Sequence, residues 1–394
     1  MVDFCYDTLG EYNIGYPNLA RVDIDPSEFD TTWPRTVPWR ALMYFREAGI
    51  ECQAHTVESA PDGSFYPVAF AWFDHACDYF DLMSKQLHQR LRNRTVQVLF
   101  YYHEGDSPFT IKQTLDQRCR DHELPVDCYQ FVSANSAASS IPRFVYFDDH
   151  MHFFKYLNRF QSAEAVQAGE RPYEFTALNR THKWWRAACM TDLHRTGILD
   201  NSLWSYNTEF DWIEDDPNDN PIQLGAIPGL APAIEQFLQQ GPYWCDSDNQ
   251  EQHNDHSGVN TDLYTQSYCH IVIETLFDTN GSGGAFITEK TYKAIKYGQP
   301  FVIVGAPGSL QILREQGYRV FDHAINNHYD EIEHNTKRWT AIRRLLSELK
   351  QKDLQEWHSS CIEDIRHNQM LFQSSAQSSL QKLLKDLNIK EHYE

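Results

Sequence analysis

Short runs of hydrophobic residues alternate along the chain with segments whose hydrophobic residues recur every three or four positions. Residues 95–105, TVQVLFYYHEG, are rich in β-branched and aromatic side chains and end at a glycine, which is typical of a buried parallel strand. Residues 107–122 start with Ser-Pro and have helical spacing, and residues 126–136 return to the strand pattern. The first half of the chain therefore predicts a β-α-β order.

The second half repeats this alternation. The predicted strands are 173–180, 203–207, 267–275, 300–305 and 318–322 (YRVFD), and the predicted helices are 182–199, 288–297 and 309–317. From about residue 336 to 390 the chain is rich in Leu, Lys, Glu and Gln, which predicts two or three surface helices. Strands that alternate with helices favour parallel sheets with helices on both faces.

The length predicts more than one domain, because single cores stop growing beyond roughly 250–300 residues and this chain has 394. Residues 161–175 are polar and small and contain a glycine and a proline, which is typical of a boundary. We predict an α/β protein with two Rossmann-like doubly wound domains, residues 1–170 and 171–335. Residues 336–394 are predicted to form C-terminal helices that pack on these domains.

The amino-acid composition indicates which binding partners and which cellular compartment to expect. Lys and Arg total 34 against 55 Asp and Glu, a formal net charge of −21, which argues against bulk nucleic acid as the main partner. No apolar run of about 18 residues occurs, so we expect no transmembrane segment. The N-terminus lacks the pattern of a signal peptide. Nine scattered cysteines without a Cys-x-x-Cys pair predict reduced thiols in a cytoplasmic protein.

The first candidate site is Thr288-Glu289-Lys290, which follows a short apolar run and starts a predicted helix. In doubly wound sheets, ligands bind beyond the carboxyl ends of the strands, where helix N-termini present N–H groups to anions. A lysine there can neutralise a diphosphate, and a carboxylate can accept hydrogen bonds from sugar hydroxyls. The alternative is that Glu289 only complements the positive end of the helix while Lys290 faces water. Spacing alone leaves both open.

Residues 273–308, IETLFDTNGSGGAFITEKTYKAIKYGQPFVIVGAPG, resemble the donor-binding motif of the α1,3-fucosyltransferases (glycosyltransferase family 10) and related GT-B and exostosin-like enzymes. The matching positions are Glu274, Phe286, Ile287, Thr288, Glu289, Lys290, Ala294, Gly298, the strand 300–304 and Gly305. Two features depart from the family pattern: Thr291 replaces the usual Leu, and the spacing to Gly298 and Pro300 is shorter. The resemblance implies a GT-B-like fold and a donor site that includes Glu274, Thr288, Glu289 and Lys290.

A second, weaker resemblance covers residues 177–207. In the family, an Arg-containing strand-to-helix unit contacts the donor diphosphate, and NRTHKWWR is similar to it, which implies Arg180, Lys183 and Arg186. Three cations in seven residues at a predicted helix start also indicate a bound anion, because helix starts favour acids. The alternative is a solvated basic face. Trp184 and Trp185 fit packing better than base stacking.

The candidate general base is Glu104. An inverting sugar transfer needs a carboxylate to deprotonate the acceptor hydroxyl and cations to take up charge on the leaving diphosphate. The resemblance implies a base at a strand end in the N-terminal domain, and Glu104 follows the predicted strand there, with Asp106 and His103 as substitutes. The alternative is a polar turn in which Asp106 or Ser107 caps the next helix.

Metal chemistry is not expected. Residues 245–256 contain an Asp-x-Asp, Asp246 and Asp248, similar to the metal motif of GT-A enzymes. The Thr-Glu-Lys resemblance implies instead a donor site that needs no metal cofactor. Residues 146–154 also mix His and Asp with aromatic residues, and we expect them to form a half-buried segment.

We predict a cytoplasmic glycosyltransferase, hexosyl- or fucosyltransferase-like, that uses a nucleotide-sugar co-substrate. We expect it to need no metal and to have no transmembrane segment. We expect an inverting transfer to a glycan or other hydroxyl acceptor. Two alternatives stay open: a non-catalytic carbohydrate- or nucleotide-binding module, and a glycosyltransferase that acts on modified DNA bases.

Overall fold

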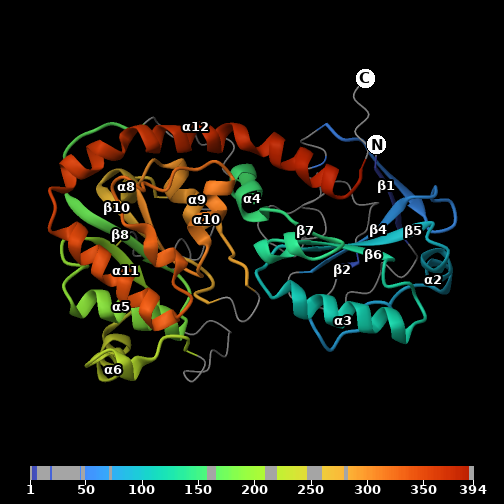
Figure 1. Cartoon of the computed structure of the whole chain (residues 1–394), viewed down its shortest axis with the longest axis horizontal. Helices are drawn as coiled ribbons and strands as arrows, with labels where there is room; N and C mark the ends of the chain where they lie inside the picture. The colour runs from blue at the N-terminus through green and yellow to red at the C-terminus, as the bar shows by residue number, and fades with distance from the viewer. Residues whose placement is uncertain are drawn as a thin grey trace. The chain divides into compact units, whose positions relative to one another are not determined.

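The computed structural model describes residues 2–6, 18–19, 45, 49–70, 73–157, 166–208, 220–245, 260–278 and 283–389 (Figure 1). The chain divides into two compact units. Unit 1 comprises Met1–Phe153, Asn280–Gly284 and Ser375–Glu394, and unit 2 comprises Phe154–Thr279 and Ala285–Ser374. The C-terminal helices therefore belong to the two units and do not form a third one.

Unit 1 is built on a mostly parallel sheet with the strand order β3-β1-β4-β5-β6-β7. Neighbours along this path pair in parallel, and β2 pairs antiparallel with β4. The strands are β1 (Val2–Tyr6), β2 (Asn18–Leu19), β3 (Cys52–Thr56), β4 (Ser64–Phe70), β5 (Val96–Tyr102), β6 (Tyr129–Ser133) and β7 (Phe144–Tyr146). The helices are α2 (Lys85–Arg92), α3 (Pro108–Asp121), the 3-10 helix η4 (Ser136–Ser140) and α4 (Asp149–Leu157), which continues into unit 2.

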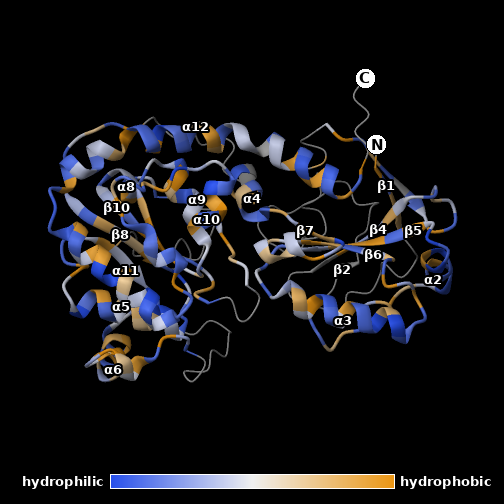
Figure 2. Ribbon diagram, in the orientation of Figure 1, coloured by the Kyte–Doolittle hydropathy of each residue, from blue (hydrophilic) through white to orange (hydrophobic). Residues whose placement is uncertain are grey.

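Both faces of this sheet are covered, as the side chains of β5 show. Val98 and Phe100 belong to a core that includes Ile111 of α3 and Leu87 of α2. Leu99, whose side chain points to the opposite face, belongs to a second core with Leu380, Leu383, Leu384 and Leu387 near the end of the chain. A strand buried on both faces is hydrophobic along most of its length, which explains why β5 does not alternate between polar and hydrophobic residues after Gln97 (Figure 2).

Unit 2 contains a four-stranded parallel sheet with the order β11-β10-β8-β9. Its strands are β8 (Tyr173–Asn179), β9 (Leu203–Tyr206), β10 (Ser267–Ile273) and β11 (Phe301–Val304). Its helices are α5 (Trp184–Arg195), η6 (Leu224–Ala226), α6 (Leu230–Gln240), α8 (Asp262–Thr265), α9 (Glu289–Lys296), α10 (Ser309–Glu315), η7 (Asn327–Glu331), α11 (Asn335–Lys350) and α12 (Leu354–Asp386), whose last turns lie in unit 1.

Two groups of helices cover the two faces of this sheet. Asp192 of α5 accepts hydrogen bonds from Trp339 and Arg343 of α11 at 3.0 and 3.3 Å. Tyr292 of α9 stacks on Phe372 of α12 with ring centroids 6.1 Å apart. Figure 1 shows α5 and α11 on one side of β8 and β10 and α9 and α12 on the other. The predicted α/β class with parallel sheets is confirmed.

The strand order of unit 2 creates a topological switch point. From β8 the chain proceeds to β9 on one side, and it then returns to the other side of β8 to form β10. Asn179 at the end of β8 is therefore level with Ile273 at the end of β10. In open α/β sheets, ligands bind beyond the carboxyl ends of strands at such a point.

One predicted strand is wrong. Residues 318–322, YRVFD, form no strand, because their backbone groups pair with side-chain amides instead of a neighbouring strand. Asn368 of α12 accepts from Arg319 N and donates to Arg319 O, both at 2.8 Å, and Asn327 donates to Val320 O at 2.7 Å. The other strands and helices named above from the sequence are confirmed to within a few residues.

Three further expectations concern the cysteines, membrane-spanning helices and residues 146–154. All nine cysteines are free. Among the described residues, no helix has the length and apolar character needed to cross a membrane. Residues 146–154, expected to be half-buried, are buried more deeply than that, with Asp148 and Asp149 only 5% and 1% exposed.

Candidate functional site

The carboxyl end of β10 is joined to the start of α9 through Glu274. This side chain is fully buried. Its carboxylate accepts hydrogen bonds from Thr288 N at 3.2 Å, from Thr288 Oγ1 at 2.5 Å and from Thr291 Oγ1 at 2.6 Å. Burying a carboxylate is costly unless its oxygens are hydrogen-bonded, and these donors meet that need. Glu274, assigned to the donor by resemblance, therefore lies beneath the surface of the site.

Glu289 and Lys290 form the first turn of α9, which Thr288 caps. The Lys290 ammonium donates to Thr288 Oγ1 at 3.1 Å, to Thr275 Oγ1 at 3.2 Å and to Glu289 Oε1 at 3.2 Å. The Lys290 side chain is 27% exposed and that of Glu289 17%. Lys290 does not simply extend into solvent, as the alternative interpretation required.

The first turn of α5 supplies cations to the same edge of the sheet. Arg186 is 3% exposed, and it donates to Glu274 O at 2.8 Å and to Thr181 O at 3.1 Å. Burial lowers the pKa of its guanidinium, while the nearby Tyr206, Glu274 and Glu289 oppose that shift. Arg186 is therefore not part of a solvated basic face. It holds the loop after β10 against the start of α5.

Lys183 is the N-cap residue of α5, and its ammonium donates to Thr275 O at 3.1 Å. Lys183 and Arg186 thus connect the segment after β8 to the segment after β10, on both sides of the switch point. Arg180 is exposed just before them. The first turn of α5 contains no acidic residue. The neighbouring Trp185 is buried and stacks on Phe277 at 5.2 Å, which confirms its predicted packing role.

Two buried residues at this edge have no counterpart in the sequence predictions. Asn179 ends β8 and is 2% exposed, yet within the described part of the chain neither its amide nitrogen nor its amide oxygen has a hydrogen-bond partner. Arg338 of α11 is 1% exposed and donates to Gly305 O at 3.1 Å and to Ile332 O at 2.7 Å, and burial lowers its pKa to about 10. Asn179 and Arg180 precede α5 in the sequence, but no local sequence pattern indicates that the side chain of Asn179 is buried.

Glu104 lies in unit 1, at the turn that follows β5. Its carboxylate is 3.3 Å from His103 Nε2, and its side chain is 26% exposed while that of His103 is 7% exposed. Asp106 accepts a hydrogen bond from Tyr102 at 2.5 Å, and Ser107 makes no side-chain capping bond to α3. The capping alternative is therefore wrong for Ser107, and Asp106 is paired with the tyrosine.

The turn that carries Glu104 is held by neighbouring strand ends. Asn135 donates to Gly105 O at 2.9 Å, and a ring nitrogen of His150 lies 3.0 Å from His103 O. Gly284 lies against this asparagine: a Cβ atom on Gly284 would be 2.1 Å from Asn135 Oδ1 and 2.5 Å from Ala137 N. Only glycine fits there. Burial raises the pKa of Tyr102, and the adjacent Asp106 and Glu104 raise it further.

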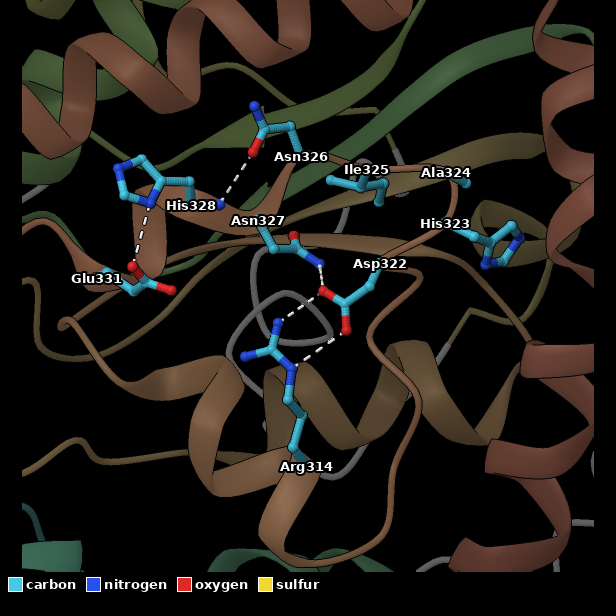
Figure 3. A pocket seen from close by; sticks show the side chains of 9 residues that line it. All are labelled: Arg314, Asp322, His323, Ala324, Ile325, Asn326, Asn327, His328 and Glu331. Carbon is cyan, nitrogen blue, oxygen red and sulfur yellow. Dashed lines mark hydrogen bonds and ion pairs between the residues drawn. The ribbon is translucent and has the colours of Figure 1, made fainter.

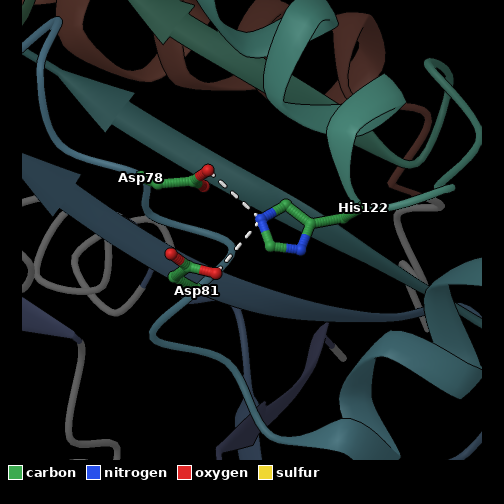
Figure 4. Close-up of side chains that lie close together, drawn as sticks. All are labelled: Asp78, Asp81 and His122. Atoms are coloured by element: carbon green, nitrogen blue, oxygen red, sulfur yellow. Dashed lines mark hydrogen bonds and ion pairs between the residues drawn. The ribbon is translucent and has the colours of Figure 1, made fainter.

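In the part of the chain that the structure describes, one group of three side chains has the chemistry and spacing to hold a metal ion. His122 Nε2 lies 3.2 Å from Asp78 Oδ2 and 3.4 Å from Asp81 Oδ1 (Figure 4). Arg118 Nε lies 3.7 Å from the same Asp78 oxygen, so a cation already faces this carboxylate. The ion pairs and the position of His122 at the end of α3 suffice to explain the cluster. Asp246 and Asp248 lie outside the described residues.

An open groove of about 480 Å³ follows α10 in unit 2 (Figure 3). Arg314 donates to both oxygens of Asp322 at 2.7 and 3.2 Å, and His328 faces Glu331 at 3.1 Å. The carboxylates of Asp322 and Glu331 already have partners within the groove, and none of the predicted site residues lines it. We therefore place the candidate site at the switch point, where cations from two segments converge.

Comparison with models of known families, with characterised proteins and with solved structures finds no match to this chain. The function of the chain is therefore inferred from the geometry of the switch point and from the short sequence resemblance.

Proposed function

We propose that the chain is a glycosyltransferase that moves a sugar from a nucleotide-sugar donor to an acceptor hydroxyl. The observation that carries this proposal is the convergence of Lys183 and Lys290 at the switch point of unit 2. Their ammonium groups donate to Thr275 O and Thr275 Oγ1, so both lie around one residue after β10. Two ammonium groups beside a helix N-terminus suit a ligand with two adjacent negative charges, such as a diphosphate.

In this mechanism the two lysines take up charge on the leaving nucleoside diphosphate, which supports a reaction without a metal ion. Glu289, partly exposed and bonded to Lys290, is suited to accept hydrogen bonds from donor hydroxyls. Arg180 is an additional cation at the exposed start of this segment. We assign unit 2 to the donor and unit 1, with Glu104 as general base, to the acceptor, which is the division of labour in a GT-B-like enzyme.

A thermal-shift screen with ADP, GDP, UDP and their sugar conjugates tests the proposal. A ligand at 100 times its Kd stabilises the folded protein by about 2.7 kcal/mol, which raises the melting temperature measurably. Lys290→Ala should reduce the shift, whereas Lys337→Ala, at an exposed lysine on α11, should retain it in full. No shift with any of these ligands would contradict the proposal.

The same ligands distinguish an enzyme from a binding module. A glycosyltransferase is expected to release nucleoside diphosphate from its sugar conjugate, slowly with water and faster with an acceptor. Binding without any release, with a range of sugar acceptors present, would assign the chain to the non-catalytic alternative.

A further inference from the structure

The hydrogen bonds of the buried Glu274 indicate how the site is held in place. Oε1 accepts from Thr288 N and from Thr291 Oγ1, and Oε2 accepts from Thr288 Oγ1. The residue is 0% exposed and the two threonines are 1% and 0% exposed. A carboxylate that is enclosed and already accepts three hydrogen bonds has no open route to a ligand.

Thr288 connects this carboxylate to the surface. A hydroxyl can donate one hydrogen bond and still accept others. Thr288 Oγ1 donates to Glu274, and it accepts from the Lys290 ammonium at 3.1 Å and from Lys290 N at 3.5 Å. The position of the ammonium group is thus tied, through one hydroxyl, to the position of the buried carboxylate.

Thr291 fixes the orientation of that carboxylate from the next turn. Its hydroxyl lies on α9, one turn beyond the capping threonine, and bonds to the oxygen that also receives Thr288 N. Rotation of the carboxylate would break bonds to both threonines together. Within the described residues, the hydrogen-bond donors to this carboxylate are two hydroxyls and one backbone N–H, so neutral groups hold it and not a salt bridge.

We propose that Glu274, Thr288 and Thr291 are positioning residues, which hold the start of α9 and the Lys290 ammonium at the end of β10 without contacting the donor. The effect of these three residues on ligand affinity rests on the proposed function. Glu274 is then not a donor contact but a residue that acts through Lys290. It also gives a role to Thr291, the position at which the sequence departs from the fucosyltransferase pattern.

The test compares Thr291→Val, which removes the hydroxyl at similar volume, with Thr291→Ser, which keeps it. The matched control is Thr191→Val: Thr191 is also buried in unit 2, at 2% exposure, but its hydroxyl has no hydrogen-bond partner among the described residues. Thr288→Val and Thr288→Ser form a second pair in case Thr291→Val does not fold. Amide hydrogen exchange of residues 286–292 is measured without ligand, and Kd and kcat with the nucleoside diphosphate or sugar conjugate that binds best.

We expect faster exchange at residues 286–292 in Thr291→Val, and not in Thr291→Ser or Thr191→Val. Loss of a hydrogen bond to a charged group is expected to weaken nucleotide binding about tenfold, with kcat changed less than KM. Equal exchange in Thr291→Val and Thr191→Val would overturn the inference, as would wild-type affinity in Thr291→Val. If the wild-type protein binds no nucleotide, the proposed function fails, and the exchange comparison alone decides the inference.

Discussion

The two units present acidic residues at the carboxyl edges of their parallel sheets, but they treat these residues differently. In unit 2, Glu274 is 0% exposed and accepts three hydrogen bonds from Thr288 and Thr291. In unit 1, the Glu104 side chain is 26% exposed, and its carboxylate lies 3.3 Å from His103 Nε2. The backbone around Glu104 is held by Asn135 and His150, which leaves the carboxylate itself at the surface.

This difference separates a carboxylate that organises a site from one that can react. A general base must reach the proton that it removes, so it needs an exposed oxygen and a firmly held backbone. A positioning carboxylate needs the opposite, since solvent would compete for its hydrogen bonds. By this criterion Glu104 meets the requirements of the proposed base, and Glu274 does not.

The largest expected effect is the loss of turnover in Glu104→Gln, which tests whether the partly exposed carboxylate is the general base. The amide cannot take up the acceptor proton, so kcat should fall by about 10²–10⁴-fold while nucleotide affinity is retained. Steady-state kinetics and calorimetric binding measure the two separately. Asp106→Asn, at the neighbouring residue paired with Tyr102, is the control. Normal turnover in Glu104→Gln would transfer the role of base to another carboxylate.

The next effect is a loss of stability in acid, expected mainly in unit 2. His270 and His358 are 3% and 0% exposed, and burial lowers the pKa of each to about 3. The folded chain keeps them neutral, whereas the unfolded chain takes up protons below about pH 6.5. Stability should therefore fall as the pH decreases from about 6.5 towards 3, by about 3 kcal/mol for each histidine at pH 4.

Denaturant unfolding of wild type and His358→Phe at pH 7 and at pH 4.5 measures this dependence. The variant removes one titrating group, so its free energy of unfolding should depend less steeply on pH. His88 in unit 1, whose pKa burial also lowers, provides His88→Phe for comparison. Identical pH dependence in wild type and His358→Phe would show that His358 is not buried as described.

A smaller effect, on nucleotide binding, is expected from Lys290→Ala, which tests the site in unit 2 that Glu274 holds in place. The lysine is partly exposed and packs little, so the folded protein should lose almost no stability. Loss of a charged hydrogen-bond donor should weaken diphosphate binding by about 1.5–3 kcal/mol. Calorimetry with the best-binding nucleotide and thermal unfolding without it give the two values. Unchanged affinity would remove Lys290 from the donor site.

The smallest expected effect is that of metal removal. If Lys183 and Lys290 neutralise the leaving diphosphate, transfer activity should persist in excess EDTA. Asp81→Asn, in the cluster with Asp78 and His122, should also leave activity unchanged. Loss of activity in EDTA and its recovery with Mn²⁺ would instead implicate a metal site, and Asp81→Asn would then show whether this cluster provides it.

The elements that the sequence predicted well are those whose pattern is local. β5 and β10 are mostly hydrophobic and buried along almost their whole length, and α3 and α9 start with Ser-Pro and with a capping threonine. Residues 318–322 resemble a strand in their hydrophobic pattern, but their backbone binds the side chains of Asn368, 49 residues from Arg319, and of Asn327, which follows Val320 by 7 residues. A local pattern cannot report a partner that lies about 49 residues away.

The sequence by itself determined the α/β class, the order of the main elements and the residue types of the candidate site, because propensity, capping and composition are properties of neighbouring residues. Only the tertiary structure decided the switch point between β8 and β10, since strand order depends on pairings between distant segments. It also decided that Arg186 binds carbonyl oxygens and that Glu274 is enclosed while Glu104 is partly exposed. Burial is set by the packing of the whole chain, and it changes what the same residue type can do.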